Sequence, residues 1–168
     1  LVLCEGKKAF MTSIGIEAHI MKKSEEYRDK KTGFRRYADA TIKSFMEGYD
    51  RADAEVDIDG KKFEVKKAIS LIITKIPYYG YGLEMVPNAK FGDGNLHFLS
   101  LNSMRYDIPY LLMSTAITGR NEAGSYKKGK KIRITTDREI DLQINGDYEK
   151  KGKEFNFEVL PNRLKIRY

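Results

Sequence analysis

The tripeptide Asn145-Gly146-Asp147 places a carboxylate beside a tight turn between two segments of alternating apolar and polar residues. An Asn-Gly pair supplies the positive φ angles of a two-residue hairpin turn, and the alternation on both sides fixes the strand register. A carboxylate held on such a rigid frame can act as a general base. Asp147 can equally be a solvated turn residue, because Asn, Gly and Asp are common turn formers. Both interpretations stay open at this point.

Two glycine-rich turns lie upstream, separated by a short strand-like segment. The first is Tyr79-Gly80-Tyr81-Gly82 and the second is Phe91-Gly92-Asp93-Gly94-Asn95. Glycine permits positive φ and a close approach of the backbone to a ligand. Neither turn has the pattern of a P-loop or of a dinucleotide-binding fingerprint. Tyr78 and its neighbouring tyrosines can line a pocket for an acyl chain or head group, or they can pack as core.

The histidines and the single cysteine indicate structural roles. His19 and His97 fall in or beside predicted strands, where a hydrogen-bonded structural histidine is commoner than a catalytic one. Cys4 cannot form an internal disulfide, and nothing at its spacing suggests a metal cluster. We therefore expect a reducing compartment.

The formal net charge of +7 at pH 7 has three candidate explanations. Many lysines stand in turn-like clusters, such as Lys22-Lys23 and Lys61-Lys62, where solvated loops are the commonest cause. An anionic membrane surface comes second, since each Lys or Arg near such a surface contributes about 1 kcal/mol. Nucleic acid comes third. Basic and apolar residues alternate in 163–168, but no motif of a nucleic-acid-binding module is present.

Strand signals dominate the rest of the sequence. Residues 53–59 and 62–66 alternate around Asp59-Gly60, which predicts a hairpin, and residues 68–75 can follow as a third, more buried strand. The further predicted strands are 8–14, 95–101, 131–135, 139–144, 154–160 and 163–167. Together they predict a mainly β domain, an antiparallel sandwich or barrel.

Two helices are predicted to interrupt the strands. Residues 33–47 carry apolar residues at helical spacing, and Gly48 supplies a stop signal. The apolar face of this helix is expected to contain Phe34, Tyr37, Ala38, Thr41, Ile42, Phe45 and Met46. A second helix is predicted at about 103–118, before Gly119. We expect both helices to pack on the sheet, although a membrane or a partner protein could also receive an apolar helix face.

A length of 168 residues suits one domain, and we expect residues 1–168 to form a single domain. No stretch approaches the ~18 apolar residues of a membrane-spanning helix. The chain opens with Leu1-Val2-Leu3, so we expect it to be part of a longer protein.

Six short motifs in order resemble the C-terminal domain of the diacylglycerol kinase and sphingosine kinase superfamily, bacterial-type lipid kinases distantly related to NAD kinase. Gly15-Ile16-Glu17-Ala18 is similar to the family's G-x-D-A, and Asp93-Gly94-Asn95-Leu96 to its D-G-x-L. Asn145-Gly146-Asp147 falls where the family has D-G-E. The other three matches are Gly33-Phe34-Arg35-Arg36-Tyr37 to G-x-x-x-Y, Gly80-Tyr81-Gly82 with Pro87-Asn88-Ala89 to G-x-G then P-x-A, and residues 158–166 to x-V-x-P-x-x-L-x-V.

The resemblance implies a β-sandwich domain that holds an acceptor lipid. The nucleotide would be bound by a preceding domain with a G-G-D-G-T motif, which this chain lacks. In bacterial members the D-G-x-L turn binds a structural Mg²⁺, and by motif matching its ligands here are Asp93 and the carbonyls of Lys90 and Asn95. One carboxylate and two carbonyls suit Mg²⁺ chemically, although Asp93 can also simply cap its own turn.

The resemblance also implies that Asp147 stands in place of the glutamate that acts as general base in lipid phosphorylation. Aspartate is one methylene shorter than glutamate, and Asn145 replaces a charged residue by a neutral one. The function that the resemblance implies is that of the C-terminal domain of an ATP-dependent lipid kinase. ATP would be a co-substrate bound mainly by the N-terminal domain, and the chain alone would be inactive.

The expected partners are a lipid substrate, an anionic membrane surface and the N-terminal nucleotide-binding domain of the same protein, with no nucleic acid. The expected location is the cytoplasm, with peripheral membrane association. The first alternative is a non-catalytic lipid or membrane-surface binding module. The second is a β-barrel nucleic-acid binder, whose binding to single strands would fall steeply with salt.

Overall fold

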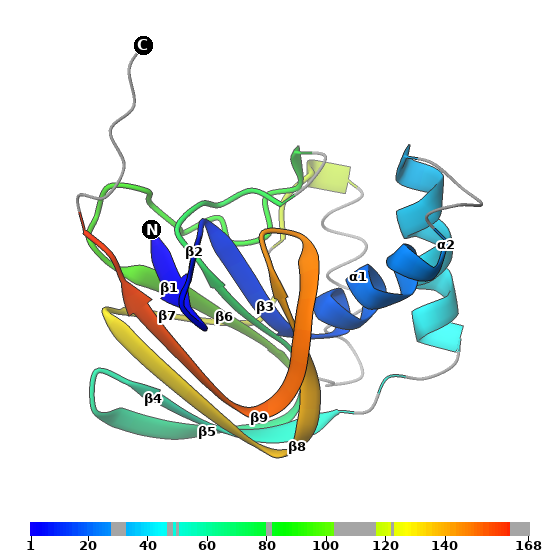
Figure 1. The fold of residues 1–168 in the computed structure, drawn as a ribbon. Coiled ribbons are helices and arrows are strands. Elements are labelled where there is room, and N and C mark those ends of the chain that lie inside the picture. The colour runs from blue at the N-terminus through cyan, green and yellow to red at the C-terminus, as the bar shows by residue number, and fades with distance from the viewer. Residues whose placement is uncertain are drawn as a thin grey trace.

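The computed structural model describes residues 1–27, 33–46, 49, 51–79, 82–102, 117–121 and 123–161. Within these residues the chain forms nine strands and two helices, and every pairing between named strands is antiparallel (Figure 1). The elements are β1 (Val2–Cys4), β2 (Lys7–Ala9), β3 (Met11–Gly15), α1 (Ile16–Glu26), α2 (Gly33–Met46), β4 (Ala52–Ile58), β5 (Lys61–Thr74), β6 (Leu96–Asn102), β7 (Ser125–Gly129), β8 (Lys131–Ile144) and β9 (Asp147–Val159).

Four of the strands close on themselves. β3 pairs with β5 and β8, and β4 pairs with the same two strands, so β3, β5, β4 and β8 form a small barrel. The sheet continues beyond it in both directions, through β9, β1 and β2 on one side and through β6 and β7 on the other. The predicted mainly β, barrel-like antiparallel domain with two packed helices is confirmed.

Two apolar clusters lie on opposite faces of the sheet. Successive residues of a strand point to opposite faces, so Ile73 and Phe98 join the larger cluster, while Ile72 and Leu99 join the smaller one. Each of these side chains is at most 5% exposed, and fully burying one of this size contributes about 1.5–3 kcal/mol. The doubly buried half of β5 thus anchors both faces of the fold.

Two pairs of predicted strands are single long strands in the structure. Residues 62–66 and 68–75 were expected as separate strands, but 62–74 all belong to β5, which passes through a bulge at Lys67 in its pairing with β4. Lys67 adopts a φ of 51°, and its N–H donates to Asp53 Oδ1 at 2.8 Å. Residues 131–135 and 139–144 likewise lie in β8, with an irregular register between Thr135 and Ile140. Bulges bend these strands without ending them.

The helix α1 is absent from the sequence-based prediction. It follows β3 directly at Gly15, whose φ of 119° and close contact with the carbonyl of Ile69 leave no room for a Cβ atom. No side chain caps the start of α1, so the usual start signal is missing. The prediction that His19 lies in or beside a strand is therefore wrong, because His19 is within α1. His97 lies in β6, as expected.

The predicted helix at 33–47 is confirmed as α2, but its environment differs from the prediction. α1 lies against the sheet, and α2 packs on α1 as an outer layer (Figure 1). Ala40 and Ser44 are fully buried, whereas Ile42 and Met46 are 58% and 81% exposed, so the buried face is rotated from the expected one. Of the predicted helix at 103–118, residues 103–116 lie outside the described residues and residues 117–118 are helical, while the predicted strand at 163–167 lies wholly outside the described residues. In the described part of the chain, neither helix has the length and apolar character needed to cross a membrane.

Candidate functional site

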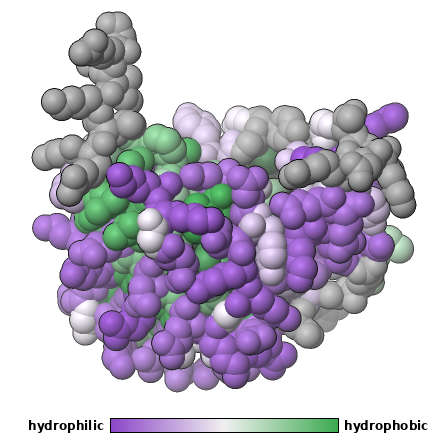
Figure 2. Space-filling view, viewed as in Figure 1, coloured by the Kyte–Doolittle hydropathy of each residue, from purple (hydrophilic) through white to green (hydrophobic). Residues whose placement is uncertain are grey.

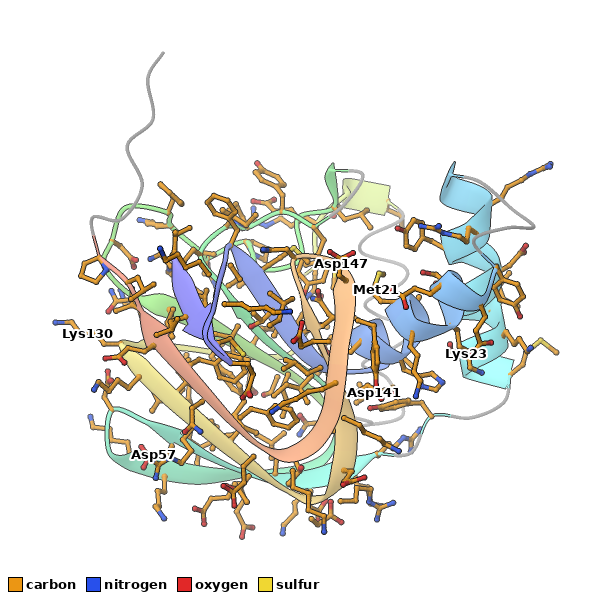
Figure 3. All side chains as sticks on the ribbon, viewed as in Figure 1. Met21, Lys23, Asp57, Lys130, Asp141 and Asp147 are labelled. Atoms are coloured by element: carbon orange, nitrogen blue, oxygen red, sulfur yellow. The ribbon has the colours of Figure 1, made fainter. Side chains whose placement is uncertain are left out.

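The Asn145-Gly146 turn joins β8 to β9 as predicted. Asn145 and Gly146 have φ angles of 54° and 93°, and Ile144 pairs with Asp147 across the turn. Asp147 is the exposed first residue of β9. Figure 3 shows Asp147 at the end of β9, on the side of the molecule that carries α1 and away from Asp57 and Lys130. The carboxylate is thus accessible to a ligand outside the domain.

Hydrogen bonds from neighbouring strands hold this turn in place. The Asn145 side-chain oxygen accepts hydrogen bonds from the backbone N–H groups of Phe10 and Met11, at 2.9 and 3.4 Å. The Asn145 N–H donates to the carbonyl of Met11 at 2.9 Å. The Gly146 N–H donates to the side chain of Gln143 at 2.7 Å. Asn145 is therefore part of the frame beneath Asp147.

The second motif, Asp93-Gly94-Asn95, forms a compact turn before β6. Asp93 Oδ1 accepts the Asn95 N–H at 3.0 Å, and the Asn95 side chain donates to the Asp93 carbonyl at 3.0 Å. Gly94 has a φ of 73°. Asp93 therefore caps its own turn, which is the plainer of its two sequence interpretations.

A buried lysine also contacts the Asp93 turn. Lys75 is 2% exposed, and its ammonium lies 3.2 Å from Asp93 Oδ1 and donates to the carbonyl of Asn95. Burial alone would raise the pKa of Asp93. The hydrogen bonds from Asn95 and the Lys75 ammonium outweigh that effect, so the pKa of Asp93 lies well below its usual range.

His97 completes this cluster. Its Nε2 lies 3.1 Å from the carbonyl of Lys90 and 3.2 Å from Asp93 Oδ1, and its Nδ1 lies 2.7 Å from the hydroxyl of Tyr126. The ring is fully buried, and this burial lowers the pKa of His97 despite the nearby carboxylate. His97 therefore has the hydrogen-bonded structural role expected from the sequence.

The three residues assigned to Mg²⁺ lie together, but their oxygens face nitrogen atoms. Asp93 Oδ1 and the Asn95 carbonyl contact the Lys75 ammonium, and the Lys90 carbonyl faces His97. Mg²⁺ requires near-octahedral oxygen ligands at about 2.0–2.1 Å, usually including waters. An ammonium and an imidazole nitrogen of the chain are therefore the neighbours of these three oxygens.

Phe10 connects the two turns. Its N–H donates to Asn145, and its carbonyl accepts hydrogen bonds from the Lys75 N–H at 2.8 Å and the Thr74 hydroxyl at 3.2 Å. Its ring is 36% exposed and lies 6.1 Å from that of Phe91. The Asp147 turn and the Asp93 turn therefore lie at the same end of the barrel.

Glu17 is a chemically unusual residue whose environment the sequence does not reveal. The Ser70 hydroxyl lies 2.6 and 2.7 Å from its two carboxylate oxygens. Burial raises the pKa of Glu17 to about 7, although the contact with Ser70 opposes the rise. In the sequence, Glu17 is marked only by its place in the Gly15-Ile16-Glu17-Ala18 segment. Its contact with Ser70 on β5 depends on the fold.

His19 and Asp141 form a second pair that the sequence did not predict. His19 Nδ1 lies 3.0 Å from Asp141 Oδ2, and Asp141 is only 4% exposed. They line a hollow of about 760 Å³ together with Lys22, Tyr49, Asp137, Arg138, Glu139, Ile140, Lys151 and Lys153. Side chains of both charge signs line the hollow. Figure 2 shows hydrophilic side chains over most of the face in view, with hydrophobic groups gathered near β1.

The tyrosines of the first glycine-rich turn have different environments. Tyr78 is 53% exposed, while Tyr79 packs against the smaller apolar cluster. Burial raises the pKa of Tyr79 well above its usual value, and nearby Glu17 adds to the rise. Tyr79 is thus a packing residue here. Gly80 and Tyr81 lie outside the described residues.

Comparison with known proteins assigns the fold and motifs to a family. The profile of the YegS C-terminal NAD kinase beta sandwich-like domain matches residues 11–168. The chain belongs to this family. The YegS-type domain match includes the Asp93 and Asn145–Asp147 turns and all strands from β3 to β9. No curated protein sequence matches the chain.

Solved structures support the YegS-type fold. A diacylglycerol kinase from Bacillus anthracis str. Sterne is 19% identical, with a TM-score of 0.64, covering 95% of this chain and 52% of that one. A "putative diacylglycerol kinase" from the same organism is 18% identical, with a TM-score of 0.68 and coverages of 95% and 53%. The chain thus spans about half the length of these structures, and at this identity the likeness is one of fold.

Proposed function

We propose that this chain is the acceptor-lipid domain of an ATP-dependent lipid kinase of the diacylglycerol kinase type. The observation that carries the proposal is the family match over residues 11–168, a range that contains the Asp93 and Asn145–Asp147 turns. The similar structures described as diacylglycerol kinases are about twice as long. In this proposal the other half binds the nucleotide, and the chain alone is inactive.

Asp147 is proposed as the general base. The lipid hydroxyl oxygen attacks the γ-phosphorus of ATP, the bond from that phosphorus to the β,γ-bridging oxygen breaks, and ADP leaves. Asp147 takes the hydroxyl proton. Phosphoryl transfer depends mainly on positioning and charge neutralisation, with the base within about 3 Å of the hydroxyl. The exposure of the Asp147 carboxylate and the hydrogen bonds that fix the turn beneath it support this assignment.

The proposal includes the partners implied by this chemistry. ATP would arrive as its Mg²⁺ complex on the N-terminal domain, and the lipid would come from an anionic membrane surface at which the protein is peripheral and cytoplasmic. The net charge of +7 favours such a surface, because each nearby Lys or Arg contributes about 1 kcal/mol.

A non-catalytic lipid or membrane-surface binding module is the second candidate. It is favoured by Asn145, whose side chain is used in hydrogen bonds to Phe10 and Met11 and brings no second negative charge beside Asp147. The shorter side chain of Asp147, compared with the family's glutamate, points the same way. In this case the turn would be kept for the fold alone.

The test is an assay of the full-length protein with Mg-ATP and a panel of lipid hydroxyls, including diacylglycerol, ceramide and a sphingoid base. Loss of the base in Asp147→Ala should lower kcat by about 10²- to 10⁴-fold. Asp147→Glu restores the family residue and should retain turnover. Glu154→Ala, on the exposed side of β9, is the matched control. Full turnover in Asp147→Ala would remove the base assignment, and no transfer to any lipid by a folded, ATP-binding protein would favour the second candidate.

A further inference from the structure

We propose that Lys75 supplies, from within the chain, the positive charge that the family resemblance assigns to Mg²⁺ at the Asp93 turn. The proposal concerns how the domain is held together, and it stands whether or not the full-length protein is a kinase. Its observable consequence is a fold whose stability does not depend on divalent cations.

The burial of Lys75 is the first step of the argument. A lysine that is 2% exposed holds an ammonium group out of water, which costs several kcal/mol unless a counter-charge and hydrogen bonds compensate. Asp93 Oδ1 at 3.2 Å supplies the counter-charge, and the Asn95 carbonyl accepts a second hydrogen bond. These are two of the three oxygens assigned to Mg²⁺, so the ammonium uses the oxygens that the metal ion would need.

The backbone around Lys75 fixes the direction of its side chain. Lys75 directly follows β5, at the point where Thr74 pairs with His97 of β6. The Lys75 N–H donates to the carbonyl of Phe10 at 2.8 Å, and the Thr74 hydroxyl accepts the N–H of Ile76 at 3.0 Å. The lysine is therefore held beside the start of β6, and its stem spans the short distance to the turn that precedes that strand.

The third oxygen lies beside an imidazole nitrogen rather than beside the ammonium. The Lys90 carbonyl lies 3.1 Å from His97 Nε2, and the Lys90 N–H also approaches that nitrogen. Residues 90–97 are thereby closed into a loop by side chains of the chain itself. A Mg²⁺ ion at this place would have to displace a like-charged ammonium that is covalently attached and cannot diffuse away. The exchange would leave Lys75 buried without its partners, so the cluster disfavours the metal.

Thermal unfolding of the purified chain tests the proposal without any activity assay. The melting temperature of the wild type should be the same in EDTA and in millimolar Mg²⁺, and calorimetric titration with Mg²⁺ should give no saturable binding. A ligand that binds only the folded state raises the melting temperature with its concentration. A saturable Mg²⁺-dependent rise of several degrees in the wild type, lost in Asp93→Asn, would overturn the proposal.

Lys75→Ala removes the ammonium and leaves room for a hydrated ion. Lys128→Ala is the matched control, because Lys128 also approaches Asp93, at 3.9 Å, but is 57% exposed. Lys75→Ala should melt several degrees lower than the wild type in EDTA, and Mg²⁺ should raise its melting temperature, while the control stays unchanged. Equal melting of Lys75→Ala and wild type, or no response of the folded variant to Mg²⁺, would refute the proposal. If Lys75→Ala does not fold in either condition, the wild-type titration decides.

Discussion

The two turns at the Phe10 end of the barrel are built from the same residue types but use their carboxylates in opposite ways. Asn145-Gly146-Asp147 presents its carboxylate to solvent, and in the described part of the chain no side chain forms an ion pair with Asp147. Asp93-Gly94-Asn95 turns its carboxylate inward, toward a lysine and a histidine that are almost fully buried.

In these two turns the surroundings of the carboxylate, more than the motif, decide its role. Asp93 neutralises a buried charge and receives hydrogen bonds from its own turn, so these interactions stabilise the folded state. Asp147 receives its position from Asn145 and Gln143, so its own carboxylate is free to act on a ligand. Substitutions at the two turns should therefore separate stability from activity.

Asp93→Ala is expected to have the largest effect on stability. It leaves the Lys75 ammonium buried without a counter-charge, and the loss of one partner from such a pair typically costs 3–5 kcal/mol, so we expect about 3–5 kcal/mol. Urea denaturation would measure the free energy of unfolding. A loss below about 1 kcal/mol would mean that Asp93 does not neutralise Lys75, and the contrast between the turns would fail.

Glu17→Gln tests a third carboxylate, which is partly buried and lacks a cationic partner in the described structure. The pKa of Glu17 rises from an ordinary value of 4.5 to about 7, so the folded state binds more protons than the unfolded state between these pH values. Folding stability therefore falls as pH increases through this range. The pKa difference alone would lower the folding stability by about 3 kcal/mol above pH 7. Because the carboxyl is partly exposed, we expect a loss of roughly 2 kcal/mol.

The expected outcome for Glu17→Gln is a gain of about 2 kcal/mol at pH 8 and little change at pH 4. The amide keeps acceptor and donor capacity for the Ser70 hydroxyl, so packing should be preserved. Urea denaturation at several pH values measures the effect. If Glu17→Gln loses as much stability as the wild type between pH 4.5 and 7, groups other than Glu17 cause the loss.

Asn145→Ala should produce a smaller loss. The substitution leaves the N–H groups of Phe10 and Met11 without their side-chain acceptor and places alanine at a φ of 54°. The expected loss is about 1–2 kcal/mol, measured by chemical denaturation. Asn145→Asp is the control, since its carboxylate can accept the same hydrogen bonds. If both variants lose the same stability, the side-chain oxygen of Asn145 does not fix the turn.

Asp147→Ala should have the smallest effect on stability. The side chain is exposed, so the free energy of unfolding should change by less than about 0.5 kcal/mol. Under the proposed function the same variant loses turnover in the full-length protein. A loss of stability comparable to that of Asp93→Ala would show that the two carboxylates share a structural role.

The parts of the fold governed by local rules could be predicted from sequence. Asp59-Gly60 and Asn145-Gly146 mark hairpins because positive φ and alternating polarity act within a few residues. The sequence predicts the boundaries between consecutive strands less well. Lys67 takes a left-handed conformation that its residue type does not announce, so one bulged strand was predicted as two.

The missing features depend on contacts between distant segments. α1 begins at Ile16, directly after Gly15 and without a capping side chain, and packing against β5 rather than a local signal sets its start. The sequence placed Asp93 and Asp147 in their turns, but it did not reveal that Lys75 and His97 lie beside Asp93. A lysine is usually exposed, so only the fold shows that Lys75 lies beside Asp93.

The closed barrel has a consequence for the order in which the protein can be made. Ser13 of β3 and Gln143 of β8 are 130 positions apart and joined by a side-chain hydrogen bond, and the two strands pair along this seam. During synthesis, β3 leaves the ribosome long before β8 exists, so one of its edges has no partner until almost the whole chain has emerged. Such distant pairings slow folding and expose strand edges to other chains. We therefore expect chaperones that bind nascent polypeptides to increase the yield of this protein more than changes to its surface residues would.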